Sequence, residues 1–229
     1  MQLTDTPLFG IILCLLAYEI ALFIYKKTKL PYFNPLLISI AIIIAVLSIF
    51  DIDYDTFNIG GSVISLFLGP ATVVLAVPLY KQLDKLTANI LPILSGIIIG
   101  SAAGLTSVYA LARLLKLPTE QGLSLLPKSV TAPIGMEISK QIGGNASITV
   151  ASIIITGIIG AVILPAVFRI TGINDKIAIG LAIGTSAHAV GTTKAVELGE
   201  TEGAMSSLAI GVAGLITVFL APLFAWLFS

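Results

Sequence analysis

Long runs of apolar residues without charge recur along the whole chain, and they constrain its fold more than any other feature. A backbone in hydrocarbon must bond its own amides and carbonyls, so such runs form helices or a closed barrel. Barrel strands alternate in polarity over about ten residues, whereas residues 153–155 are three consecutive isoleucines. We therefore expect helices. The runs fall at about 8–25, 35–50, 60–80, 89–115, 128–142, 146–170, 177–198 and 203–228.

Composition favours lipid over water as the solvent. The 229 residues are 57% hydrophobic and 10% charged, whereas soluble domains carry about 25% charged residues. At ~20 residues per crossing, the chain has room for roughly seven or eight transmembrane or re-entrant helices. We expect one all-α, multi-pass domain over residues 1–229 in the cell membrane. Net charge is zero, and without a basic cluster nucleic acid is not an expected partner.

Three of the runs are interrupted by helix-breaking residues. Proline removes a hydrogen-bond donor and disturbs the preceding turn, and interrupted membrane helices are typical of transporter binding sites. We therefore expect broken or re-entrant helices in the runs 60–80, 128–142 and 177–198. Their breakers are Gly69, Pro70, Pro78, Pro127, Pro133, Gly184 and Gly191.

An offset of 57 residues aligns similar positions along the chain. Pro70, Pro127 and Gly184 coincide at this offset, and so do Pro165 and Pro222. Each copy would be a polar, interrupted helix followed by a long helix rich in small residues. Two interpretations stay open: an internal repeat of about 57 residues, or accidental alignment of a sequence rich in glycine, alanine and isoleucine.

Polar side chains are densest in residues 184–194, which carry four hydroxyls, one imidazole and one ammonium group. An ionisable residue at membrane depth costs about 3 kcal/mol or more and is a functional candidate. If Gly184 or Gly191 breaks the helix, freed amides and hydroxyls there would hold a carboxylate. In the alternative, the hydroxyls bond their own helix and the lysine reaches the interface. The substrate-binding candidates are Thr185, Ser186, His188, Thr192 and Lys194.

A second polar group occupies residues 127–137. Glu137 matches Lys194 in the 57-residue frame, so the two would pair or exchange a proton during transport. In the alternative, Lys128 and Glu137 lie at opposite membrane surfaces. The substrate-binding candidates here are Lys128, Ser129, Thr131 and Glu137.

Three acidic residues precede the last run. Glu197, Glu200 and Glu202 suit the start of a helix, because acids near an N-terminus complement its dipole. We expect capping here rather than catalysis.

The residues offer no basis for an enzyme or a cofactor. His188 is the only histidine and Cys14 the only cysteine, so a metal cluster of the His/Cys type is impossible. Ser186 and His188 are two residues apart, and such positions do not face each other on a helix. We expect neither catalysis nor a metal.

Basic residues in short loops predict the orientation. Three lysines at 26–29 place the end of the first run in the cytoplasm, and three aspartates at 51–55 place the next turn outside. Arg113 would then lie outside, against the rule, so one interrupted segment does not cross. The topology beyond Arg113 stays open.

Two long motifs resemble the LrgB/CidB family. They are LLPKSVTAPIGMEIS at 125–139 and GTSAHAVGTTKAVELGETEGAMSSLAIGVAG at 184–214. The likeness covers nearly the whole chain. The family includes the LrgB-like half of the plastidal glycolate/glycerate translocator. The family's characteristic residues carry over as Lys128, Ser129, Thr131, Pro133, Glu137, Thr185, Ser186, His188, Thr192, Lys194, Glu200 and Glu202.

The resemblance implies two functions. Some members move small carboxylates such as pyruvate, glycolate or glycerate, and others are described as antiholin-like regulators of murein hydrolase activity and autolysis. Buried hydroxyls, lysine and broken backbone favour a carrier, because a holin-like pore needs none of them. We expect a monocarboxylate transporter in a homo- or hetero-oligomer with an LrgA/CidA-like subunit. The glycine face of Gly96, Gly100 and Gly104 is the expected interface.

Overall fold

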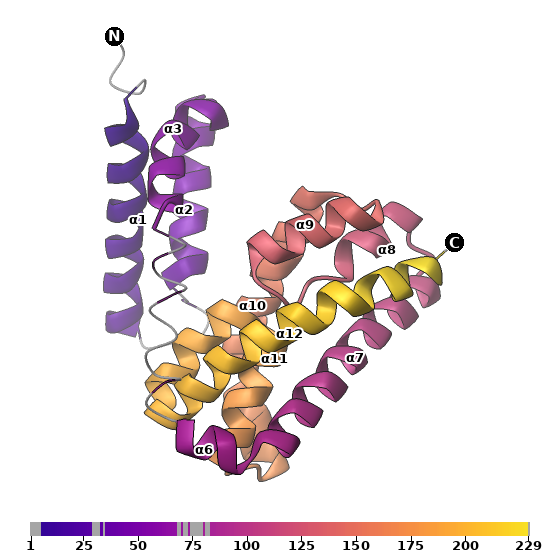
Figure 1. Ribbon diagram of the computed structural model, residues 1–229. Helices are drawn as coiled ribbons and strands as arrows, with labels where there is room; N and C mark the ends of the chain where they lie inside the picture. Colours follow the sequence, from indigo (N-terminus) through magenta and orange to yellow (C-terminus); the bar gives the residue numbers. More distant parts are fainter. Residues whose placement is uncertain are drawn as a thin grey trace. The chain divides into compact units, whose positions relative to one another are not determined.

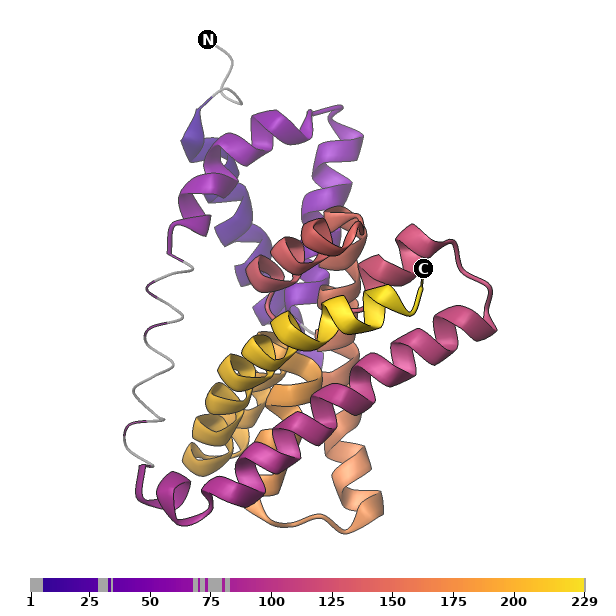
Figure 2. The same ribbon diagram turned by 45° about the vertical axis from the view of Figure 1, so that its right-hand side comes forward.

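The computed structural model describes residues 6–28, 33, 35–67, 70, 73, 80 and 83–228, and within these ranges every regular element is a helix. The chain divides into two compact units, Met1–Val74 and Leu75–Ser229, shown in Figures 1 and 2. Ten residues of the run predicted at 60–80, among them its breakers Gly69 and Pro78, lie outside the described residues, and so do Leu30–Tyr32.

The first unit contains α1 (Pro7–Thr28), α2 (Pro35–Ile49) and α3 (Tyr54–Ser65). Helix α1 packs against both α2 and α3. A Cβ at Gly10 would collide with the backbone of Phe57 and Gly60, and a Cβ at Gly60 with the backbone of Pro7 and Gly10. The two glycines therefore let α1 and α3 approach at backbone distance, as small residues do between membrane helices.

The second unit holds the remaining helices. They are α6 (Leu83–Ala88), α7 (Ile90–Leu114), α8 (Thr119–Leu125), α9 (Ala132–Ile142), α10 (Ala146–Thr171), α11 (Lys176–Leu198) and α12 (Glu200–Trp226). Helix α11 packs against α7, α10 and α12, and α12 also contacts α7 and α9. At the end of α12, Arg113 of α7 donates to the carbonyl of Leu227 and lies 5.5 Å from the ring centre of Phe228.

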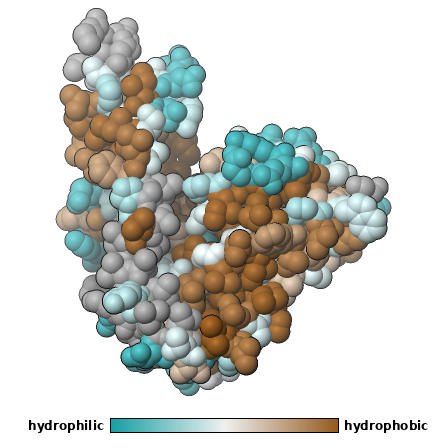
Figure 3. Space-filling view, in the orientation of Figure 1, coloured by the Kyte–Doolittle hydropathy of each residue, from teal (hydrophilic) through white to brown (hydrophobic). Residues whose placement is uncertain are grey.

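Four helices among the described residues are long and apolar enough to cross a membrane: α1, α7, α10 and α12. The 25 residues of α7 span about 37 Å at 1.5 Å per residue, against ~30 Å of hydrocarbon. Figure 3 shows hydrophobic side chains over α12, where Leu215, Phe219 and Leu223 are exposed, and hydrophilic ones over α9. The described part of the chain is all-helical as expected, and these four apolar helices fit a multi-pass membrane protein.

The helix boundaries follow the predicted spacing. Helix α8 begins at Thr119 and α11 begins 57 residues later at Lys176. Helix α7 ends at Leu114 and α10 ends 57 residues later at Thr171. In the copy around Pro70, the long helix is α7, and part of the interrupted helix before it lies outside the described residues.

Both described interrupted segments are broken, but the break in α11 is not at a glycine. Helices α8 and α9 are separated by the non-helical residues 126–131. In α11 the helical backbone fails at His188, which has φ 42° and ψ −136°. The prediction of a break at Gly184 or Gly191 is wrong for a physical reason: a Cβ at Gly184 would collide with the Ser206 carbonyl and with Ala209 of α12. Gly184 serves close packing instead.

Candidate functional site

A cavity of about 620 Å³ lies among α7, α11, α12 and the connection between α8 and α9. One side is formed by α7 from Pro92 to Leu105, and the opposite side by α11 from Ile177 to Ser186. The connection contributes Leu126, Lys128 and Ser129. All the described lining residues belong to the second unit, so the cavity lies within one body of packed helices.

Four of the predicted binding residues meet at this cavity: Lys128 and Ser129 from the connection, and Thr185 and Ser186 from α11. The ammonium of Lys128 donates to the Ser129 hydroxyl over 3.1 Å. Among the described lining residues Lys128 is the only cation, and no described carboxylate forms an ion pair with it. This end of the cavity therefore favours an anion.

Buried hydrogen bonds fix the two helices that flank the connection with Lys128. Thr149 of α10 donates its hydroxyl to the Ser124 carbonyl and lies 2.8 Å from the Ser139 hydroxyl. The Ser124 hydroxyl accepts from the amide of Asn145. All three hydroxyl residues are fully buried, and they tie α8, α9 and α10 together. The sequence analysis missed them, because isolated serines and threonines in apolar runs carry no distinguishing pattern.

Thr131, another predicted residue, is the N-cap of α9 with an extended backbone. It is half-buried and is not among the residues that line the cavity. Its place is the last residue of the break, 57 positions before His188. Thr131 and His188 thus mark corresponding points where two polar segments leave helical geometry.

His188 and Thr192 lie behind the cavity wall. His188 is 2% exposed, and its Nε2 donates to the Ile153 carbonyl of α10 over 2.9 Å. A Cβ at Gly157 of α10 would come within 2.7 Å of the imidazole, so this glycine makes room for the ring. Thr192 bonds the His188 carbonyl and the Ser206 hydroxyl. Both predicted residues support the break in α11 and do not line the cavity.

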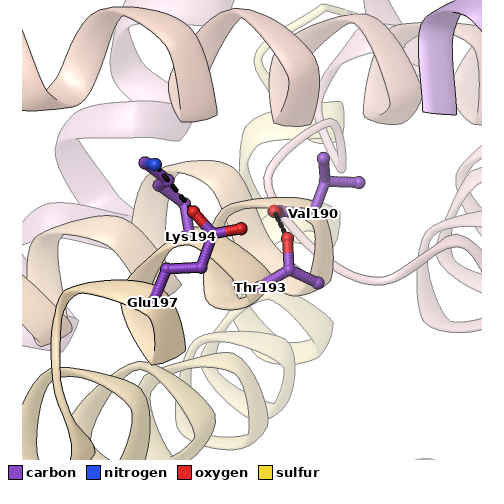
Figure 4. Close-up of polar contacts among 4 residues, drawn as sticks. All are labelled: Val190, Thr193, Lys194 and Glu197. Atoms are coloured by element: carbon purple, nitrogen blue, oxygen red, sulfur yellow. Dashed lines mark hydrogen bonds and ion pairs between the residues drawn. The ribbon is translucent and has the colours of Figure 1, made fainter. Parts of the chain in front are cut away.

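Glu137 and Lys194 do not pair with each other as the repeat suggested. Glu137 forms an ion pair with Lys140 at 2.8 Å, and Figure 4 shows the Lys194 ammonium directed at Glu197, at 2.7 Å. Each pair joins neighbouring turns of one helix, the local arrangement that favours such pairs. Neither residue is among those that line the cavity.

Glu200 and Glu202 occupy the first turn of α12, which confirms the predicted helix start. The N-cap residue itself is Gly199, which has no side chain to cap the helix. Glu202 is 6% exposed, with its carboxylate against Gly199. Its Oε2 has no hydrogen-bond partner among the described residues.

The glycine face of α7, predicted as a subunit interface, lines the cavity. Gly96, Gly100 and Gly104 all belong to the wall, with Ser101 beside them. A Cβ at Gly100 would lie 3.1 Å from Thr185, while Gly96 and Gly104 face open space. The sequence signal for this wall was the spacing of four, which also indicates helix association.

Comparison with known proteins agrees with the sequence motifs. The model of the LrgB-like family matches residues 14–227. The chain is 40% identical over 228 residues to antiholin-like protein LrgB of Bacillus subtilis strain 168, which covers 99% of both chains. It is 38% identical over 225 residues to the proteins of that name from Bacillus mycoides and Bacillus cereus, with 98% of each chain covered. No solved structure matches. With its two characteristic motifs on the broken helices α8–α9 and α11, this membrane protein belongs to the LrgB-like family.

Proposed function

We propose that this protein carries small monocarboxylates, of the pyruvate, glycolate or glycerate type, across the cell membrane. The observation that carries the proposal is Lys128, a half-buried cation at the wall of a cavity in a membrane-spanning unit. A cation at low dielectric attracts an anion strongly. A carboxylate would supply the negative partner that the described residues do not give Lys128.

The hydroxyls that line the cavity together with Lys128 suit the rest of such a substrate. Ser129, Thr185 and Ser186 each carry a group that both donates and accepts. The Ser186 hydroxyl donates to the Ala182 carbonyl at 2.6 Å, so its lone pairs remain for a donor such as a substrate hydroxyl. Hydroxyl-bearing carboxylates therefore match the chemistry of this wall.

The broken backbone also favours a carrier. Carriers often place substrates where discontinuous helices of internal repeats meet. Here the α8–α9 connection and the break in α11 are separated by 57 residues, and each is followed by a long apolar helix. We interpret the two as copies of one unit, with the cavity beside both breaks.

A second function is favoured by the relatives, which are named antiholin-like proteins. As a regulator of lysis, this protein would act on a membrane partner of the LrgA/CidA type and change the leak of large solutes. That function predicts no saturable uptake of a small acid. Saturation with stereochemical preference separates the two functions.

The test is uptake of radiolabelled pyruvate and glycolate into liposomes that contain the protein, with and without an LrgA-type subunit. We expect saturable uptake that Lys128→Gln lowers at least tenfold. Lys140→Gln is the matched control, because Lys140 lies on the adjoining helix α9, pairs with Glu137 and is exposed. Uptake that rises linearly with concentration, or is equal in the two variants, would exclude the carrier.

A further inference from the structure

The cavity is much larger than a two- or three-carbon acid requires. Its volume of about 620 Å³ lies in the range of about 300–1,000 Å³ that holds drug-sized ligands. Glycolate or pyruvate bound at Lys128 would leave most of this space unfilled. Apolar side chains that face unfilled space lose van der Waals contacts. The unfilled volume therefore favours a ligand with more apolar atoms than glycolate or pyruvate.

The two ends of the cavity differ in charge. Gly100 of α7 packs against Thr185 of α11. The connection with Lys128 reaches this end of α7, because Leu126 and Leu105 belong to one buried cluster. Ile90 lies ten residues before Gly100 on α7, and Asp175 lies ten residues before Thr185 at the start of α11. Ten residues of helix span about 15 Å, so Ile90 and Asp175 are at the other end of the cavity. Asp175 lines the cavity and accepts from the amide of Ala178 at 2.8 Å. The cavity thus has a cation at one end and a carboxylate at the other.

The wall between these ends is apolar. Pro92 and Ile93 of α7 and Ile177 and Leu181 of α11 line it, and Ile177 and Leu181 pack against the buried cluster that contains Ile93. A second carboxylate on the ligand would meet either these side chains or the negative charge of Asp175. The distribution therefore fits one anionic head and one apolar body, and disfavours dicarboxylates.

Two glycines of α7 keep the cavity wide without a packing reason, Gly96 along the apolar part and Gly104 beyond Gly100. A Cβ at Gly96 or Gly104 would meet nothing within 4 Å, unlike one at Gly184, which would collide with α12. Alanine is the better helix former and would fit at both positions. The absence of side chains there keeps space open that helix packing does not need.

We infer that the cavity accepts monocarboxylates with an extended apolar side chain, bound with the carboxylate at Lys128 and the side chain along Gly96, Ile177 and Leu181. The inference rests on the proposed function and specifies the substrate class of that site. Head-group chemistry is set by Lys128 and the hydroxyls, and the length of the tail is set by the wall of α7. Affinity then rises with each methylene that the wall can cover.

The test uses 2-oxo acids that share one head and differ in the tail: pyruvate, 2-oxobutanoate and 2-oxohexanoate. Binding to the protein in phosphatidylcholine nanodiscs is measured by calorimetry, and each acid is also tested as an inhibitor of pyruvate uptake. We expect affinity to rise about fourfold per methylene, the factor that corresponds to transfer of one buried methylene. Lys128→Gln should remove this binding, which separates it from partition into the lipid.

A paired glycine exchange tests where the tail lies. Gly96→Leu fills the proposed tail space and should lower the ratio of 2-oxohexanoate to pyruvate affinity at least tenfold. Gly211→Leu is the control, because Gly211 is exposed on α12, also has nothing within 4 Å and does not line the cavity. In Gly211→Leu, the ratio of 2-oxohexanoate to pyruvate affinity should equal that of the unaltered protein. Gly96→Ala gives a smaller change of the same sign if the leucine variant does not fold.

The outcomes are distinct. Equal or falling affinity along the series, with Lys128-dependent pyruvate uptake intact, overturns the inference and leaves the carrier standing. Absence of binding and uptake for every acid overturns both. An anionic lipid also combines a charged head with an apolar tail; if phosphatidylglycerol discs abolish the chain-length effect, the lipid is the occupant and the inference is wrong.

Discussion

The hydroxyl of Thr192 on α11 lies 2.7 Å from the hydroxyl of Ser206 on α12, and both residues are almost fully buried. Thr192 has one proton, which it donates to the His188 carbonyl at 2.9 Å. Ser206 is therefore the donor to Thr192. The break in α11 is thus tied to α12 through two hydroxyls.

Substitutions of Thr192 and Ser206 should lower the free energy of unfolding by different amounts. Thr192→Val takes away both the donor to His188 and the acceptor for Ser206, and should cost about 1–2 kcal/mol because a buried group is left unpaired. Ser206→Ala leaves Thr192 bonded to the carbonyl and should cost about 0.6 kcal/mol, the average for interhelical bonds in membranes. Unfolding in mixed micelles measures both, and a double variant equal to the sum of the single ones would refute the coupling.

Gly184→Ala should push α11 and α12 apart. The added methyl would collide with the Ser206 carbonyl and approach the Ala209 methyl carbon to 2.8 Å, and overpacking typically costs about 1–3 kcal/mol. Gly211→Ala on the open face of α12 should be neutral or stabilising by up to ~1 kcal/mol, because alanine favours the helix. Melting temperatures in detergent compare the two, and equal values would contradict the close packing.

The long helices could be predicted from hydropathy alone. Helices α1, α7, α10 and α12 coincide with apolar runs, because in lipid a sufficiently long apolar segment is helical whatever its neighbours are. The break in α11 could not be found this way. Gly184 and Gly191 are the residues that suggest a break, but close approach to α12 and to the Ala187 side chain requires a missing Cβ there, and the sequence does not distinguish the two uses of glycine.

The site was predicted in part. Polar groups at membrane depth identified Lys128, Ser129, Thr185 and Ser186, which line the cavity. The same argument included Lys194, although Glu197 three residues later already indicated a local ion pair. Hydroxyls that support the connection, such as Thr149, were not identified because their partners are brought together only by the packing of α8, α9 and α10.

His188 should tolerate glycine better than alanine. Its φ of 42° is one that residues with a Cβ rarely adopt, and such positions store about 1–3 kcal/mol of strain. Both variants lose the bond to Ile153, but only glycine relieves the backbone, so we expect His188→Gly to be more stable by about 1 kcal/mol. Ala187→Gly, one residue earlier in helical backbone, should instead lose about 1 kcal/mol. Denaturation midpoints that rank alanine above glycine at position 188 would argue against the break.

Lys128 and Lys194 should differ sharply in transport, although the sequence assigns them similar roles. Lys128 lines the cavity without a described ionic partner, whereas Lys194 is joined to Glu197 on its own helix and does not line it. Exposed pairs of this kind contribute about 0.3–0.5 kcal/mol, so Lys194→Gln should change stability and pyruvate uptake little, within about twofold. Lys128→Gln should lower uptake at least tenfold, since it removes the charge that binds the carboxylate. Initial rates in liposomes at matched protein density give the comparison. A larger loss at Lys194 than at Lys128 would move the anion's path from the cavity to the outer side of α11.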